Sequence, residues 1–155
     1  MAEEEQAPYE IVFYEDEDGN EPALKFMQSL DGAKRRAIGV AINEVLRYEG
    51  PDVAAGNFGR SLGDGLYEFK LDQDAEQILR RKGRNPRPEA EEAKILLRMF
   101  FHPYGRKILL LLGGYDKGEQ SSKPRQQMEI EAAKKILNRW KLKQKQASSP
   151  AGKRK

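Results

Sequence analysis

The chain of 155 residues contains no cysteine and only one histidine, His102. Without cysteine there can be no thiol nucleophile, disulfide or thiolate metal site, and one histidine is too few for a multi-histidine zinc site. No apolar run approaches the roughly 20 residues of a membrane-spanning helix. The N-terminus is acidic, unlike the basic start of a secretory signal peptide. We therefore expect a cytoplasmic protein that does not enter a membrane and uses neither a metal nor a small-molecule cofactor.

Several common catalytic motifs are missing as well. There is no paired-carboxylate motif and no Ser/His/Asp order, and Gly113-Gly114 is not part of a GxGxxG or GxxxxGK[ST] phosphate-binding loop. The charge is instead segregated along the chain. Residues 1–31 hold ten acidic residues and one lysine, whereas residues 106–155 hold 14 lysines and arginines against four acidic residues. The basic half favours a polyanionic partner, although a solvated helix and tail would show the same pattern.

The strongest structural signal is a β-hairpin over residues 93–115. Its arms cover residues 94–102 and 106–112, with a turn between them that contains a proline and a glycine. The second arm is an unbroken apolar run, which is typical of a strand covered on both faces. A short buried helix would have the same composition, but the flanking turn residues favour a strand. Arg98 stands in the middle of the first arm, where a buried charge needs a reason.

The rest of the chain predicts two more strands, three helices and a single domain. Alternation indicates strands at residues 9–14 and 66–71. Asn20 and Asp31 are candidate caps for two helices that end near Leu30 and Gly50, and a last helix covers residues 124–143. The order β-α-α-β-β-β-α predicts an α+β fold: a small, antiparallel-rich, twisted sheet with an N-terminal helical hairpin on one face and the C-terminal helix at an edge. The domain spans residues 9–143, between an acidic disordered tail (1–8) and a basic disordered tail (144–155).

Apolar residues at three- and four-residue spacing define the buried side of each helix. The predicted stripes are Ala23, Phe26, Met27 and Leu30 in the first helix, Ala37, Ile38, Ala41, Ile42, Val45 and Leu46 in the second, and Met128, Ala132, Ile136 and Trp140 in the last. We expect the first two helices to pack on the sheet as an antiparallel pair.

Candidate functional residues are cations near one sheet face. In strand 66–71, Glu68 and Lys70 point away from the helices, so a suitable register would place Lys70 beside Arg98. With these we group Lys117, Lys123, Arg125 and Tyr115. Such a set could hold a phosphodiester and stabilise an oxyanion that develops at phosphorus. Ordinary surface ion pairs explain Lys70 and Lys117 equally well, and we read His102 as a turn residue rather than a catalytic base.

Residues 72–93 are long for a connection between strands. They include five cations that we expect to contact RNA phosphates, in a loop where Gly and Pro prevent a helix: Arg80, Arg81, Lys82, Arg84 and Arg87. A segment of this length is either functional or disordered, and its composition allows both.

The chain resembles the RelE/ParE superfamily of toxins, and most of all its phage-derived, HigB-like branch. The resemblance is carried by the element order, the phrase at residues 63–70, the Arg98 strand, the phrase at residues 107–115 and the Lys123-Pro-Arg segment before the last helix. It covers about residues 9–141. It implies a type II toxin that is a ribosome-dependent endoribonuclease and cuts mRNA by activating the 2′-OH against the adjacent phosphate, without a metal. Its implied partners are the ribosome, mRNA and a cognate antitoxin, often a helix-turn-helix protein.

The resemblance also implies roles for individual residues. Lys70 matches a catalytic or RNA-holding cation, Arg98 matches the arginine that contacts the scissile phosphate, and Lys117 follows the last strand as a basic residue does in the family. Two departures are that Glu68 stands where RelE has a second lysine, so that Glu68 is a candidate base, and that no tyrosine follows Lys117. ParE-type relatives share the fold but inhibit DNA gyrase, so the fold does not decide the function. An inactive prophage remnant is the third alternative.

Overall fold

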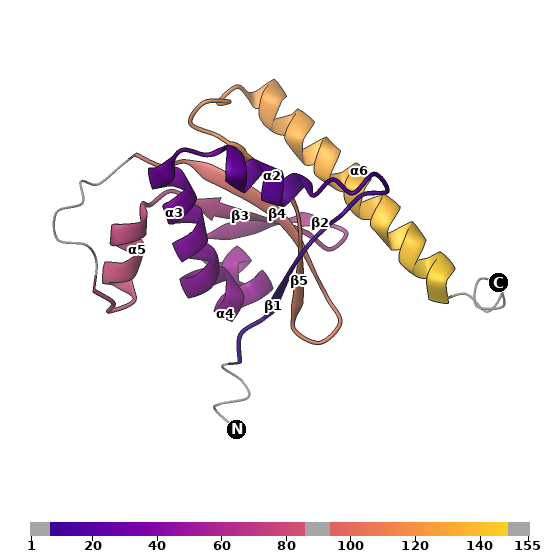
Figure 1. Ribbon diagram of the computed structural model, residues 1–155, viewed down its shortest axis with the longest axis horizontal. Coiled ribbons are helices and arrows are strands. Elements are labelled where there is room, and N and C mark those ends of the chain that lie inside the picture. The colour runs from indigo at the N-terminus through magenta and orange to yellow at the C-terminus, as the bar shows by residue number, and fades with distance from the viewer. Residues whose placement is uncertain (1–6, 86–93, 149–155) are drawn as a thin grey trace.

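The computed structural model describes residues 7–85 and 94–148, and in this part of the chain five strands form one sheet of order β1-β5-β4-β3-β2 (Figure 1). They are β1 (Glu10–Phe13), β2 (Gly59–Gly63), β3 (Leu66–Leu71), β4 (Leu97–Tyr104) and β5 (Ile108–Asp116). Neighbouring strands are antiparallel, except that β1 runs parallel to β5. The α+β fold is confirmed. Strand β2 is not predicted from the sequence, because this short segment contains two glycines and has no apolar alternation.

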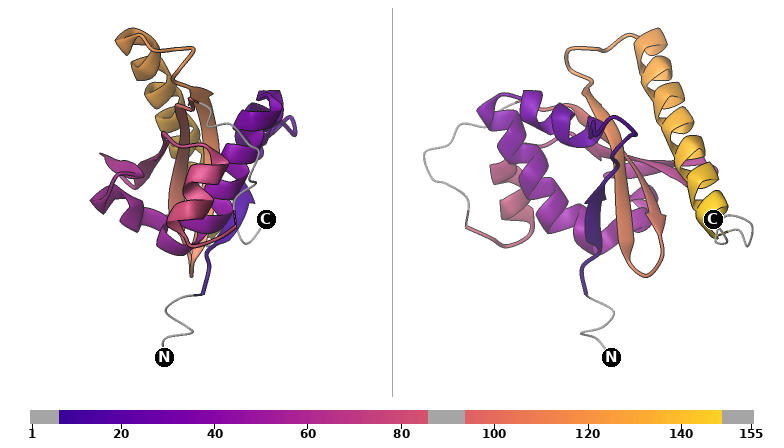
Figure 2. Two further views of the ribbon diagram at one scale, coloured as in Figure 1. Left: turned by 90° about the vertical axis from the view of Figure 1, so that its left-hand side faces the viewer. Right: turned by 45° about the vertical axis from the view of Figure 1, so that its right-hand side comes forward.

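The helices lie on both sides of the sheet (Figure 2). On one side are α2 (Pro22–Ser29) and a second helix that begins as α3 (Gly32–Ala41) and continues through a π-helical turn (Ile42–Leu46) into α4 (Arg47–Glu49) and a 3-10 turn (Gly50–Ala55). On the other side is α6 (Lys123–Ser148). The remaining helix, α5 (Ala75–Arg81), follows β3. No helix within the described residues is both long enough and apolar enough to cross a membrane.

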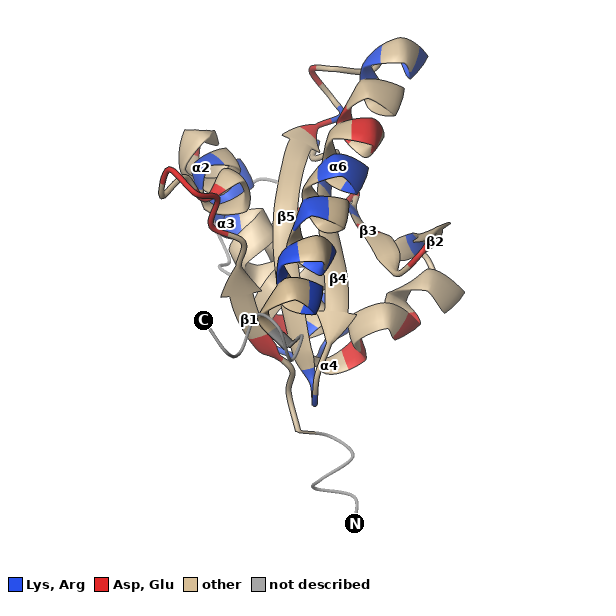
Figure 3. Ribbon diagram, turned by 90° about the vertical axis from the view of Figure 1, so that its right-hand side faces the viewer, with Lys and Arg blue, Asp and Glu red and all other residues tan. Residues whose placement is uncertain are grey.

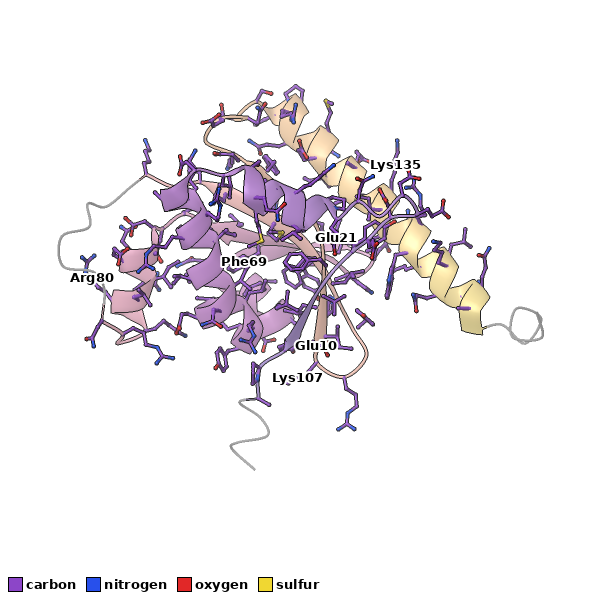
Figure 4. All side chains as sticks on the ribbon, viewed as in Figure 1. Glu10, Glu21, Phe69, Arg80, Lys107 and Lys135 are labelled. Carbon is purple, nitrogen blue, oxygen red and sulfur yellow. The ribbon has the colours of Figure 1, made fainter. Side chains whose placement is uncertain are left out.

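The first core lies between the helical hairpin and the sheet. All six predicted stripe residues of the second helix are buried there, which confirms that stripe. The sheet contributes Phe69, Leu71, Leu97, Met99, Phe101, Leu109 and Leu111 to the same core. Phe69 is fully buried and lies in the interior of the molecule in Figure 4. The predicted Asp31 cap is also confirmed, because its side chain accepts a hydrogen bond of 2.9 Å from the Lys34 N–H.

The second core lies between α6 and the opposite face of the sheet. Ile130, Ala133 and Leu137 of α6 are buried against five sheet residues: Leu66, Phe100, Leu110, Leu112 and Tyr115. The prediction that the last helix lies at a sheet edge is therefore wrong. The reason is that alternate leucines of β5 face opposite sides, so both faces need a cover. Met128 of the predicted stripe is 63% exposed, and the helix continues to Ser148, beyond its predicted end.

Part of the predicted long loop is helical. Asp74 and Gln77 form a capping box in which each side chain accepts a hydrogen bond from the other residue's backbone N–H. This box starts α5, and Arg80 and Arg81 occupy its last turn. The expectation that Gly and Pro prevent a helix is wrong for this stretch, because Gly83 comes only after the helix has ended.

Two local predictions also need correction. Strand β4 continues through Pro103 to Tyr104, so Pro103 is not part of the turn. Beyond Phe101, β4 is paired with β5 alone, so one side of the strand at Pro103 is an edge, where proline is tolerated. Asn20 does not cap α2, whose N-cap is Glu21. The backbone N–H of Asn20 instead donates to Asp16 Oδ1 at 2.8 Å.

The packing of α2 on β5 depends on a glycine. A Cβ atom at Gly114 would lie 2.6 Å from the Arg98 carbonyl oxygen and 2.6 Å from the Phe26 ring, whereas a Cβ at Gly113 would have nothing within 4 Å. The two adjacent glycines thus differ in whether a side chain fits.

We predict that Gly114→Ala lowers the free energy of unfolding by about 1–3 kcal/mol, because it overpacks this contact. The matched control, Gly113→Ala, should be neutral or stabilising by up to about 1 kcal/mol, because alanine restricts the unfolded chain. Urea denaturation of the two variants checks this. Equal effects would contradict the close approach of α2 to β5.

A second contact joins the β2–β3 turn to α6. His102 Nδ1 lies 2.7 Å from the Gly65 carbonyl oxygen, and its ring packs edge-on against Trp140, with centroids 5.3 Å apart. Lys141 Nζ donates to the Asp64 carbonyl oxygen. Burial lowers the pKa of His102 below 6.5, with a further lowering from Lys141 and an opposing effect of the Gly65 hydrogen bond.

We predict that acid weakens the fold through His102. As the pH falls below about 6.5, the unfolded chain binds a proton at this histidine before the folded protein does, so the free energy of unfolding falls until the lower folded pKa is passed. Urea denaturation between pH 7 and pH 5 should show a smaller pH dependence for His102→Gln than for the wild type. The same dependence in both proteins would rule out this contribution.

Candidate functional site

Three polar side chains lie in one row across the middle strands. Lys70 of β3 is directly opposite Arg98 of β4, and Arg98 is directly opposite Tyr115 of β5. Directly opposite residues of antiparallel strands project to the same face, with Cβ atoms about 4.5–5.5 Å apart. The predicted pairing of Lys70 with Arg98 is therefore confirmed. We call Lys70, Arg98 and Tyr115 the Arg98 row.

A β-bulge brings Tyr115 into this row. Phe101 lies opposite Leu111, but the next residue back, Phe100, lies opposite Gly113, so Leu112 is an extra residue in β5. If the same residues formed a regular strand without a bulge, alternation would place Tyr115 on the same face as Leu111, under the helical hairpin. Tyr115 instead packs in the second core, where its ring stacks on Phe100 with centroids 6.0 Å apart.

Arg98 is enclosed rather than open to solvent. The residue is 3% exposed, and its Nη1 donates to Asp72 Oδ1 at 2.8 Å and to the Leu97 carbonyl oxygen at 2.9 Å. The Asp72 side chain is 48% exposed. The buried charge in this strand is thus neutralised by a carboxylate that is itself half-exposed to solvent. Asp72 thus supplies the reason that a charge in this apolar strand requires.

Glu68 lies in the adjacent row and is paired with a residue that the sequence analysis missed. It is 1% exposed, lies opposite Arg60 of β2, and its Oε1 accepts from Arg60 Nε at 2.7 Å. Its other oxygen, Oε2, is buried and has no hydrogen-bond partner among the described residues. Glu68 therefore retains one free acceptor, but solvent does not reach it in this conformation.

The remaining members of the row have contrasting environments. Burial, and secondarily the Glu68 carboxylate, raise the pKa of Tyr115 above 10.0, against smaller opposing effects of Arg98 and Arg60. The phenol therefore stays protonated at neutral pH and can donate a hydrogen bond. Lys70 is half-buried, and no ion pair within residues 7–85 and 94–148 includes it. Its ammonium is the cation of the row that is ready to bind an anion.

Three of the candidate cations follow β5 in the chain. Lys117 is half-buried in the turn that follows β5, and Lys123 is exposed at the start of α6. Arg125 is paired with Glu129 at 2.8 Å. A cavity of about 450 Å³ adjoins Tyr115 and is lined also by Arg125, Glu129 and residues of α2 and α3.

The basic segment that begins in the last turn of α5 lies elsewhere. Ile78 of α5 packs in the first core, on the face of the helical hairpin, and α5 lies far from α6 in Figure 1. Arg81 lies over the Phe58 ring at 5.6 Å, and Arg84 is paired with Glu44 at 3.0 Å. Arg80 and Lys82 are exposed, and Arg87 lies outside the described residues. These cations therefore do not extend the Arg98 row.

Two general features complete the charge distribution. Lysines and arginines recur along the side of α6 that faces the viewer in Figure 3. Within the described residues, no group of three or more His, Asp or Glu side chains is placed to hold a metal ion.

We predict that the two partners of the Arg60–Glu68 pair respond unequally to substitution. Arg60→Met leaves a buried carboxylate without a partner and should lower the free energy of unfolding by about 1–3 kcal/mol. Glu68→Leu leaves an arginine that is already half-exposed to water, and should be tolerated better. Adding Glu68→Leu to Arg60→Met should recover most of the loss in urea denaturation. A double variant as unstable as the sum of both single variants would contradict this account.

Comparison with known proteins adds no assignment. No protein-family model matches the chain, and no curated protein matches it. The functional interpretation therefore depends on the Arg98 row and on the residues around it.

Proposed function

We propose that the protein is the toxin of a type II toxin–antitoxin module and acts as a ribosome-dependent mRNA endoribonuclease. The observation that carries the proposal is the direct register of Lys70, Arg98 and Tyr115 on one sheet face. Two cations and a hydrogen-bond donor at this spacing suit a phosphodiester, and the resemblance to HigB-like toxins concerns the same residues. A cognate antitoxin, of the helix-turn-helix type, would hold the toxin inactive.

The proposed reaction is an intramolecular transesterification. The 2′-oxygen of the nucleotide attacks the adjacent phosphorus, the bond from phosphorus to the 5′-oxygen breaks, and the products carry a 2′,3′-cyclic phosphate and a 5′-hydroxyl. The 2′-OH proton must be accepted and the leaving 5′-oxygen must receive a proton. Because the nucleophile belongs to the substrate, the protein has to supply orientation, proton transfer and charge stabilisation.

The row offers a group for each task. Lys70 and Arg98 would neutralise the negative charge that grows on the non-bridging oxygens, as preorganised cations do in oxyanion sites. Tyr115 stays protonated at neutral pH, so it would donate a hydrogen bond or a proton rather than act as the base. Glu68 Oε2 is a buried acceptor without a hydrogen-bond partner among the described residues, two residues before Lys70 in the same strand, and it would take the 2′-OH proton once the substrate reaches it.

A second function is favoured by one specific observation. Arg98 and Glu68 are both nearly buried and each is already paired with an opposite charge, so much of this face is neutralised. A ParE-like toxin that binds a protein target such as DNA gyrase would need no free phosphate site. Induced expression separates the two functions: arrest of translation favours the nuclease, whereas early arrest of DNA synthesis with translation intact favours the protein target. Normal growth would favour an inactive prophage remnant.

We predict that Lys70→Gln lowers the rate of ribosome-bound mRNA cleavage about a hundredfold, because one preorganised contact to the developing charge is worth about 3 kcal/mol. Its thermal stability should be unchanged, since Lys70 has no ion pair among the described residues. Arg106→Gln is the control, since it removes an exposed cation from the β4–β5 turn. Primer extension on ribosome-bound mRNA measures the rates. Cleavage at the wild-type rate by Lys70→Gln would refute the proposed site.

A further inference from the structure

The pair formed by Arg98 and Asp72 has an unusual asymmetry. The Arg98 side chain is 4% exposed, whereas the Asp72 side chain is 48% exposed, and the two are joined by a contact of 2.8 Å. A carboxylate that is half-exposed to water is therefore held against a guanidinium that has almost no exposed surface of its own. An anion that binds to this guanidinium nitrogen has to compete with Asp72.

The chain on either side of Asp72 is fixed. Leu71 is fully buried in the first core, and Asp74 is 5% exposed and caps α5 through its capping box. Only Asp72 and Gln73 lie between these anchors. The backbone therefore cannot carry the carboxylate away, but rotation about the side-chain bonds of Asp72 can, and side-chain rotamers of exposed residues exchange within nanoseconds.

Asp72 can leave Arg98 at little cost in free energy only when another anion takes its place. The carboxylate is already half in water, so it regains hydration when it turns outward. The guanidinium is buried and would lose its only carboxylate partner among the described residues, which is strongly unfavourable for a charge. An anion that can form charge-assisted hydrogen bonds with arginine must therefore take the place that Asp72 leaves, and phosphate oxygens form such bonds well.

We propose that Asp72 is a built-in competitor for the RNA phosphate: its carboxylate occupies Arg98 in the free protein and is displaced when a phosphodiester binds across Lys70 and Arg98. This inference rests on the proposed function, because it assumes that the phosphate binds in the Arg98 row. In this role, Asp72 lowers the affinity of the protein for RNA and prevents neutral ligands from binding to Arg98. Gln73 Oε1, beside Asp72, is buried without a hydrogen-bond partner among the described residues, so this segment is not fully satisfied in the free protein.

The test measures RNA binding separately from cleavage. The probe is a fluorescent hexanucleotide with 2′-O-methyl groups, which cannot undergo 2′-oxygen attack. Asp72→Asn keeps the shape of the side chain and removes its charge, and it should bind this probe about tenfold more tightly than the wild type, since a charged competitor is worth about that factor. The matched control is Asp64→Asn in the β2–β3 turn. It makes the same change in net charge, its positive φ of 56° suits asparagine, and it should change affinity less than about twofold.

The gain should depend on Arg98. In an Arg98→Gln background, Asp72→Asn should no longer raise affinity, because there is no guanidinium to release. In the wild type, the side-chain carboxyl ¹³C resonance of Asp72 should shift as the probe saturates the protein, a measurement that does not depend on whether a variant folds. Equal affinities of Asp72→Asn and the wild type, or an Asp72 resonance that does not move at saturation, would overturn the proposal.

The outcomes also separate this proposal from the nuclease function. If the wild type fails to cleave ribosome-bound mRNA but Asp72→Asn binds the probe more tightly, the competitor stands and the nuclease assignment falls. If the wild type cleaves but Asp72→Asn neither binds more tightly nor cleaves faster, the competitor alone falls. If no variant binds the probe, the competitor is overturned together with the phosphate site.

Discussion

The constraint on which the structure depends is that β5 is covered on both faces. Its leucines alternate between the two cores, with Leu109 and Leu111 under the helical hairpin and Leu110 and Leu112 under α6. Neither cover alone would bury the run, so the helices must lie on opposite sides of the sheet. The same constraint makes a charge in the neighbouring strand costly, and Arg98 is accommodated there because Asp72 supplies the opposite charge.

The elements with strong local signals could be predicted from the sequence. The cap at Asp31, the stripe of the second helix and the apolar run of β5 each specify their structure within a few residues. Strand β2 could not be predicted, because it is defined by its pairing with β3 and not by a pattern of its own. The start of α5 did have a signal, Asp74 followed by Gln77, but the glycine and prolines further along led to its interpretation as a loop. The buried side of α6 was misplaced at Met128, because the predicted stripe and the true one coincide only near Ile136 and Trp140.

The part of the candidate site that lies on β3 could be predicted from the alternation of side chains along that strand. The same period of two that puts Glu68 and Lys70 on one face continues to Asp72, so the partner of Arg98 could have been found by extending the strand pattern by one step. Arg60 could not be identified from the sequence as the partner of Glu68, because its position depends on the pairing of β2 with β3. The basic residues near Arg80 illustrate the opposite case. Their clustering in sequence is plain, yet α5 packs on α3 through the first core and carries them to the other side of the sheet.

The bulge at Leu112 has a consequence for how this protein can change through evolution. Substitutions in the leucine run alter packing, but they leave the order of faces intact. Loss of one leucine would remove the bulge and keep Tyr115 opposite Arg98, although the second core would lose the side chain of Leu112. Gain of one residue would reverse the face of every residue that follows, unless a second bulge formed. Gly114 would then lie opposite Arg98, and the Arg98 row would lose its phenol. The site therefore tolerates a shorter leucine run better than a longer one.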